Sequence, residues 1–374
     1  MTTQTPDALA ASRDRQTAPF ERTVGLWLLV CAAMVFLMAV IGAITRLTES
    51  GLSIMEWAPV TGTLPPLSQA EWLRLFALYQ QIPEYQVDNA GMTLAEFKTI
   101  FWWEYIHRLW GRLIGLVFAL PFLWFLVRGR LQQGLAPQLL GVFALGGLQG
   151  LMGWIMVASG FAERTDVSQY RLVAHLALAL LIYGALILLA ARLLSPPPAF
   201  STERRAAALK RALAWFAALV FVTALSGGFV AGLNAGMIYN SFPLMDGALI
   251  PADYGGAGPW WLAPFESVAA AQFNHRILAI ITLAAALGLW HWSRPLQLGR
   301  GAVKAIVLMA ATALLQLGLG IATLLLVVPA WLAALHQAGA LVLLALALWA
   351  WQQVTPAQAP QRTGQRAGRA GRPS

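Results

Sequence analysis

The chain has 374 residues, of which 59% are hydrophobic and only 11% are charged, and its mean hydropathy is +0.64. This composition excludes an ordinary soluble globular protein and predicts an all-α polytopic membrane protein. The net charge of +9 does not indicate nucleic-acid binding, because most lysines and arginines lie in short loops between apolar runs and in the C-terminal tail. The single cysteine, Cys31, excludes an intramolecular disulfide and a thiolate metal cluster.

The N-terminal residues 1–24 are polar, and we expect an unstructured cytoplasmic tail, since the apolar run that follows is too long for a cleaved signal. The first membrane span is expected at residues 25–45. The polar segment 46–98 is rich in turn residues and is interpreted as an external cap with a short helix at 69–79. Seven further spans are expected at residues 101–127, 138–158, 171–191, 213–232, 269–292, 304–328 and 331–351.

Eight spans place both ends of the chain on one side of the membrane. The basic residues are concentrated on that side, so the positive-inside rule predicts that both termini are cytoplasmic, in a bacterial-type inner membrane. We expect two tandem four-helix halves, 25–192 and 213–352, joined by a cytoplasmic linker at 193–212. The tail 353–374 is rich in Gly, Arg, Gln and Pro and is expected to be disordered.

Four of the five histidines lie at one depth, a few residues inside the outer ends of alternate spans: His107, His175, His275 and His336. His291 lies at the inner end of its span and is interpreted as interfacial. A single histidine in an apolar helix is more often a packing residue than a ligand, but four at one level favour a shared role. Without an accompanying cluster of carboxylates or cysteines, bis-imidazole heme ligation fits better than a hydrolytic zinc site.

The two halves resemble a duplication. The histidines of the second and sixth spans are about as far apart in sequence as those of the fourth and eighth, segment 149–153 resembles 316–320, and Gly51 corresponds to Gly236. Because each half has four spans, the repeat is not inverted, and an axis along the membrane normal should relate the halves. The glycines of the third and seventh spans are interpreted first as close-packing residues, and alternatively as room for a flat macrocycle. They are Gly146, Gly147, Gly150, Gly153, Gly318 and Gly320.

Residues 101–115 bring a carboxylate, an imidazole and two guanidinium groups to the mouth of an apolar helix. Glu104 and His107 are three residues apart and therefore share a helix face. An ionisable group at membrane depth is by default interpreted as functional. The counterpart of Glu104 in the second half is Gln272, which cannot take up a proton in the same way, so the asymmetry marks the first half as reactive.

Five motifs, in this order on the expected spans, carry a resemblance to a known family: GAITRLTESGLS, EYIHRLWGR, VAHLA, FNHRILA and LHQAGA. Over residues 25–352 the chain resembles heme A synthase, a membrane enzyme of cytochrome oxidase biogenesis that oxidises a methyl group of heme o to the formyl group of heme a. The chain lacks the cysteine pair that some members carry in the first external loop, so thiol-based electron entry is not expected.

The resemblance implies that His275 and His336 are the axial ligands of a prosthetic heme b. It implies that His107 and His175 receive the substrate heme o and that Glu104 is the catalytic group. Two successive hydroxylations followed by loss of water need a base near the methyl group while electrons leave through a redox centre.

Two arginines follow their histidines directly. Arg108 and Arg276 are expected to pair with heme propionates, or alternatively to anchor their helices at the interface by snorkelling.

Two other functions could account for a membrane protein with several histidines and internal repeats. A dihaem b-type electron-transfer protein would stack its hemes at two depths, whereas these histidines share one level. A transporter with internal repeats would have interrupted helices and ionisable groups near the midplane. The sequence indicates neither feature. The expected partners are the lipid bilayer, a heme o synthase and an unknown electron acceptor. The sequence does not decide whether the chain forms a homo-oligomer.

Overall fold

The structure is a computed structural model that describes residues 6–58, 61–131, 134–161, 166–194, 204–256 and 258–354. Within these residues, eight helices are long and apolar enough to cross a membrane, as the sequence predicts. They are α1 (Pro6–Leu47), α4 (Leu94–Val127), α5 (Leu135–Ala158), α6 (Gln169–Leu194), α7 (Arg204–Gly232), α9 (Val268–Ser293), α10 (Arg300–Leu325) and α11 (Ala330–Gln353). The chain is therefore a multi-pass, all-helical membrane protein.

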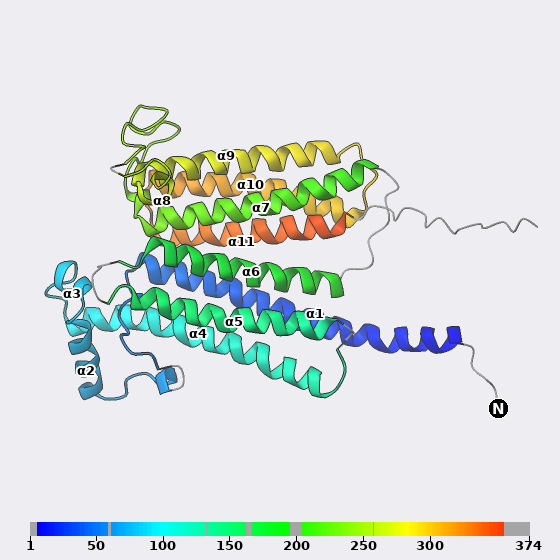
Figure 1. Ribbon diagram of the computed structural model, residues 1–374, viewed down its shortest axis with the longest axis horizontal. Helices are drawn as coiled ribbons and strands as arrows, with labels where there is room; N and C mark the ends of the chain where they lie inside the picture. Colours follow the sequence, from blue (N-terminus) through cyan, green and yellow to red (C-terminus); the bar gives the residue numbers. More distant parts are fainter. Residues whose placement is uncertain are drawn as a thin grey trace, which may run out of the picture.

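Two connecting segments lie at the same end of the helices, one beside each group of helices (Figure 1). The first cap, residues 48–93, contains α2 (Gln69–Tyr79) and α3 (Pro83–Val87). The second cap, residues 233–267, contains α8 (Ala263–Glu266). The short helix predicted at 69–79 is confirmed as α2.

Local sequence explains where several helices begin. The Ser68 side chain accepts a hydrogen bond from the backbone of Glu71 at the start of α2, and Thr93 forms a capping box with Glu96 at the start of α4. The Ser267 side chain accepts a hydrogen bond from the backbone of Ala270 at the start of α9. Such caps satisfy backbone N–H groups that have no partner inside the helix.

Three predicted boundaries are wrong. The N-terminal tail is helical from Pro6, and α7 begins at Arg204, inside the segment predicted as a linker. Hydropathy marks where the lipid ends, whereas helical hydrogen bonds continue into water. Conversely, α10 ends three residues early, because Val327 and Val328 adopt left-handed φ angles of 59° and 56°. Residues 195–203 of the predicted linker and 355–374 of the predicted tail lie outside the described residues.

The helices pack in two groups (Figure 1). In the first, α1, α4, α5 and α6 neighbour one another in a ring, and in the second α7, α9, α10 and α11 do the same in the same order. The groups meet where α6 packs on α7 and α1 packs on α11. These are the contacts that two tandem, non-inverted bundles would make, and the duplication itself stays a prediction.

Polar contacts join the two groups at the cap end. Arg46 donates to Asn234 Oδ1 at 3.0 Å and pairs with Asp166 at 3.5 Å, while Asn234 Nδ2 donates to Asp166 at 3.0 Å. Deeper between the groups, Gln337 of α11 donates to the carbonyl oxygen of Ala39 in α1 at 2.8 Å. These bonds fix the relative position of the groups beside the histidines.

Candidate functional site

His275 of α9 and His336 of α11 face each other. Their ring centroids are 6.4 Å apart, and the ring planes are almost perpendicular, at 87°. Two imidazoles that ligate one metal from opposite sides, with metal–nitrogen distances of about 2 Å, have ring centres about 6 Å apart. The pair is therefore spaced for a single metal between the two rings.

Neighbouring helices orient both rings. Ser226 Oγ of α7 lies 2.8 Å from His275 Nδ1. Gln316 Nε2 of α10 lies 3.1 Å from His336 Nδ1 and donates to the His336 carbonyl oxygen at 2.7 Å. Because Nδ1 of each ring is engaged, Nε2 is the atom left for a metal, which is how metal-binding histidines are usually held.

The N-terminal pair is held more loosely. His107 of α4 and His175 of α6 are close enough to interact electrostatically. Their Nδ1 atoms are buried without a hydrogen-bond partner, whereas His175 Nε2 lies 3.2 Å from Gln149 Nε2. Buried nitrogens without a protein partner leave both rings free to bind a further group.

Each of the four histidines packs its Cε1 atom against a glycine of an adjacent helix. An added Cβ would lie 3.0 Å from the ring of His107 at Gly42 and 3.0 Å from that of His275 at Gly227. Close packing thus limits where the rings can move. The other two contacts are Gly153 with His175, at 3.1 Å, and Gly320 with His336, at 2.8 Å.

The close-packing interpretation is wrong for the remaining glycines of α5 and α10. A Cβ added at Gly146, Gly147, Gly150 or Gly318 would meet no atom within 4 Å. Gly146 and Gly150 share a helix face with Gln149, whose amide lies at His175. This exposed glycine face of α5 adjoins the N-terminal pair.

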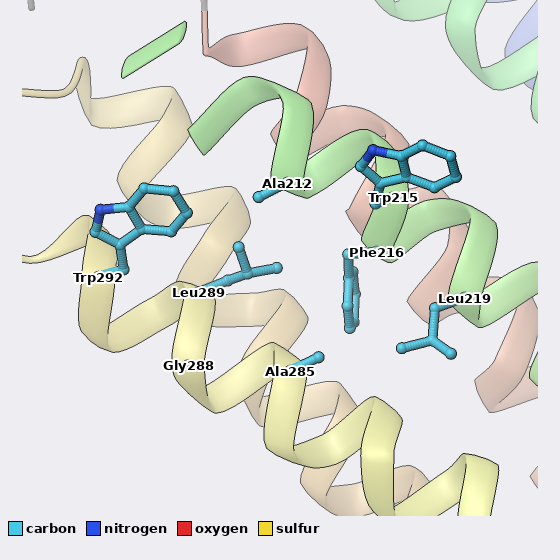
Figure 2. A pocket seen from close by; sticks show the side chains of 8 residues that line it. All are labelled: Ala212, Trp215, Phe216, Leu219, Ala285, Gly288, Leu289 and Trp292. Atoms are coloured by element: carbon cyan, nitrogen blue, oxygen red, sulfur yellow. The ribbon is translucent and has the colours of Figure 1, made fainter. Parts of the chain in front are cut away.

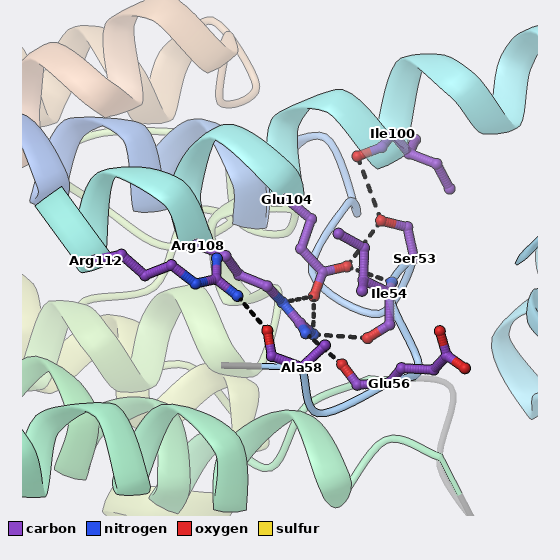
Figure 3. A network of polar contacts seen from close by, with 8 residues as sticks. All are labelled: Ser53, Ile54, Glu56, Ala58, Ile100, Glu104, Arg108 and Arg112. Carbon is purple, nitrogen blue, oxygen red and sulfur yellow. Dashed lines mark hydrogen bonds and ion pairs between the residues drawn. The ribbon is translucent and has the colours of Figure 1, made fainter. Parts of the chain in front are cut away.

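Glu104 is 2% exposed and accepts four hydrogen bonds (Figure 3). Oε2 accepts from Ser53 Oγ at 2.7 Å and from the Ile54 backbone N–H at 2.6 Å. Oε1 accepts from Arg108 Nε at 2.9 Å and Nη2 at 2.5 Å. The first cap and Arg108 therefore fix the carboxylate on the cap side of His107.

Arg108 also holds the first cap (Figure 3). Its Nη2 donates to the carbonyl oxygen of Ile54 at 2.6 Å and its Nη1 to that of Glu56 at 3.0 Å. One turn further along α4, Arg112 donates to Ala58 at 2.8 Å. Both arginines thus tie α4 to the first cap.

The second half repeats this arrangement with an amide. Gln272 Nε2 donates to the carbonyl oxygens of Ala235 at 2.7 Å and Ile238 at 2.5 Å, and its Oε1 accepts from Arg276 Nη2 at 2.7 Å. Arg276 then donates to the second cap at Tyr239 O, 2.7 Å, and at Ser241 O, 2.8 Å. Both halves thus join a helix to its cap through the residue three before the histidine and the arginine after it, whereas the correspondence of Gly51 with Gly236 stays a prediction.

Two hollows lie beside the helices that carry these residues. A cavity of about 460 Å³ lies between the first cap and α4, and Tyr105, Arg108 and Arg112 are among its lining residues. The other, of about 450 Å³, lies between α7 and α9 and is lined only by apolar residues and a glycine, Trp215 and Trp292 among them (Figure 2). The second hollow offers no side chain for proton or metal chemistry.

The residues that orient the site were not predicted from the sequence. Ser53 and Ile54 bind Glu104, and Ser226 and Gln316 orient the C-terminal histidines. The recurrence of Gln149 as Gln316 in the repeated glycine segments was the available signal. Among the described residues, no group of three or more His, Cys, Asp or Glu side chains could hold a metal ion. The histidine pairs therefore suit a metal that brings its other ligands, as heme iron does.

The chain is similar to known proteins over nearly its whole length. The family COX15-CtaA, described as cytochrome oxidase assembly protein, matches residues 25–348. A heme A synthase of Rhodospirillum centenum is 54% identical over 357 residues, covering 94% of each chain. The heme A synthase of Nitrosomonas eutropha is 49% identical over 89% of this chain and 94% of its own. That of Paramagnetospirillum magneticum is 52% identical over 88% of this chain and 93% of its own.

Proposed function

The chain belongs to the COX15-CtaA family of cytochrome oxidase assembly proteins, and from this membership we propose that it is a heme A synthase. The reaction is the oxidation of a methyl group of heme o to the formyl group of heme a. The enzyme is a multi-pass membrane oxidoreductase with heme o as its substrate.

The C-terminal pair, His275 and His336, would hold a resident heme b. The observation that supports this assignment best is the 6.4 Å separation of two rings whose Nδ1 atoms are already engaged by protein groups. A heme bound there supplies a one-electron redox centre within the membrane. Arg276 supports the site, because its Nε is buried without a hydrogen-bond partner and is suited to a propionate.

The N-terminal pair, His107 and His175, would receive heme o. A substrate must enter and leave, and three features suit exchange: the unpartnered Nδ1 atoms, the open glycine face of α5 and the adjoining cap. Gly150 in this half corresponds to Leu317 in the other, so the substrate half has more room.

Glu104 would be the catalytic base. It lies one helical turn from His107, and its oxygens are oriented by Ser53, Ile54 and Arg108. A carboxylate held in this way can take a proton from the reacting methyl group or from the water that attacks it. Arg108 would act at the substrate site by holding Glu104 and the first cap, and a propionate would compete for the same donors.

We further propose that both termini are cytoplasmic and that the caps and the histidines lie towards the outer face. The basic loops at the opposite end of the helices support this orientation. A heme o synthase would deliver the substrate, and the electrons would leave through the resident heme b to an acceptor. The four helices of each group would form one tandem half, with the substrate in the first.

The test is the pigment content of cells with and without the gene, together with the reduced-minus-oxidised spectrum of the purified protein. A heme A synthase produces extractable heme a only when the gene is present and shows a b-type heme signal in the protein. A b-type signal without heme a would instead identify an electron carrier. Absence of both would remove the heme assignment.

A further inference from the structure

A second carboxylate is buried close to Glu104. Glu84 lies in α3 of the first cap, where its residue surface is 4% exposed. Its Oε2 atom is buried without a hydrogen-bond partner. A buried, half-satisfied carboxyl group is costly and is seldom kept for packing alone.

Negative charges surround Glu84 on several elements. Burial raises its pKa to about 8, and repulsion from Glu104 of α4, Glu49, Asp166 and Asp88 adds to the effect. Glu84 is thus mainly protonated at neutral pH, and it can gain or lose a proton near that pH. Buried glutamates with such values are known in proteins.

Polar and aromatic side chains neighbour Glu84 in the first cap. The Tyr79 hydroxyl group, which is completely buried, lies beside the Glu84 carboxyl group and accepts a hydrogen bond from Asn89 Nδ2 at 2.9 Å. Tyr79 belongs to a buried cluster with Phe97 and Phe101, which lie on α4 just before Glu104. This cluster joins the first cap to the part of α4 that precedes Glu104.

We propose that Glu84 accepts protons from Glu104 and passes them to the aqueous side of the first cap. The inference rests on the proposed function, since it makes Glu84 the outlet for protons released during heme o oxidation. Glu84 touches no heme in this scheme and acts through Glu104.

The stoichiometry of the reaction requires such an outlet. With water as the oxygen source, a methyl group and one water become a formyl group, four protons and four electrons. C–H bonds break, a C=O bond forms, and the electrons leave through heme to a one-electron acceptor. The protons need another route, because an apolar site cannot accumulate them.

The first experiment follows heme a formation from added heme o against pH in wild type, Glu84→Gln and Asp88→Asn. Ionised Glu84 is the acceptor, so the wild-type rate should rise as pH increases towards about 8. Glu84→Gln should lower the rate about tenfold or more and abolish this rise, with the resident heme b retained. Asp88→Asn removes the exposed carboxylate that contributes least to the repulsion, so it should keep the rate and the rise with pH, with at most a small downward shift of the midpoint. A wild-type rate and pH profile in Glu84→Gln would overturn the proposal.

The second experiment does not depend on activity. The infrared C=O band of a protonated carboxylic acid should be present at neutral pH, disappear with a midpoint of about 8 and be missing in Glu84→Gln. In Glu104→Gln the midpoint should move down, because a repelling neighbour is removed. An unchanged midpoint would show that the two carboxylates are not coupled and would overturn the relay. If wild type made no heme a, the proposed function would fail, while this titration would still decide the coupling.

Discussion

Glu104 and Gln272 occupy corresponding positions, three residues before their histidines, but they bind their caps with opposite hydrogen-bond polarity. Glu104 accepts from a hydroxyl and a backbone N–H group of the first cap, whereas Gln272 donates to two carbonyl oxygens of the second. Each cap is therefore matched to the residue that it covers. The presence of an amide at Gln272 does not show that an amide would fit at Glu104.

Replacing Glu104 by Gln tests both roles. If the amide oxygen accepts from Ser53 and Ile54, its NH2 group faces the donors of Arg108, and we expect a loss of stability of about 1–3 kcal/mol. Heme a formation should fall by about 10²- to 10⁴-fold, the effect of losing a general base, with heme o or a partly oxidised product accumulating. Pigment analysis and thermal unfolding measure the two effects separately. Near-normal heme a in a folded variant would make Glu104 structural.

Replacing His275 or His336 by Ala should remove heme b from the purified protein, because each change deletes one of two axial ligands. The heme-to-protein ratio and the low-spin spectrum report the loss. His291→Ala is the matched control, since His291 lies on the same helix as His275 but is exposed. Full heme content in both ligand variants would refute the assignment.

Adding a single methyl group next to a histidine ligand should also weaken heme b binding. In Gly320→Ala the new Cβ would lie 2.8 Å from His336 Cε1, so the ring must shift. We expect heme b affinity to fall by roughly ten- to hundred-fold, as for other changes around metal ligands. Gly318→Ala, on the same helix but with no atom within 4 Å of the new Cβ, should leave heme binding unchanged. Heme titration of the two variants makes the comparison, and equal affinities would show that the glycine contact does not position His336.

Replacing Arg276 or Arg108 by Leu or Lys separates the effect of the positive charge from that of the hydrogen-bond geometry. Arg276 donates to several acceptors at once, a pattern that the single ammonium group of Lys cannot reproduce. We expect Arg276→Leu to lower heme b retention, Arg276→Lys to lower it less, and Arg108→Leu to affect heme o binding instead. Retention equal to wild type in the Leu variants would favour interfacial anchoring.

Glu84 should make the first cap sensitive to pH. Its pKa is raised from 4.5 to about 8 by burial, so the folded state binds a proton more tightly than the unfolded state. The stability of the cap should therefore fall as pH rises between these values, by up to about 1.4 kcal/mol per pH unit. Hydrogen exchange of α2 and α3, corrected for intrinsic rates, measures this slope. Glu84→Gln should flatten it and Asp88→Asn should not, and an equal slope in all three proteins would contradict the prediction.

Much of the fold follows from local properties of the sequence. Hydropathy is summed over consecutive residues, so it indicated the eight spans and, from the charges between them, an expected orientation. The helix ends were less predictable, because α1 and α7 extend beyond the apolar runs and left-handed Val327 ends α10. Hydropathy describes the contact with lipid rather than the end of a hydrogen-bonded helix.

The sequence by itself determined the class of the protein and the contrast between Glu104 and Gln272, and it predicted a common level for the four histidines. Only the tertiary structure decided which groups surround them. Ser53 binds Glu104 from about fifty residues away, and Glu84, one polar residue among many in the segment 46–98, becomes a buried acid. Periodicity along one helix predicts which side chains share a face, but the residues that contact that face depend on how distant segments pack.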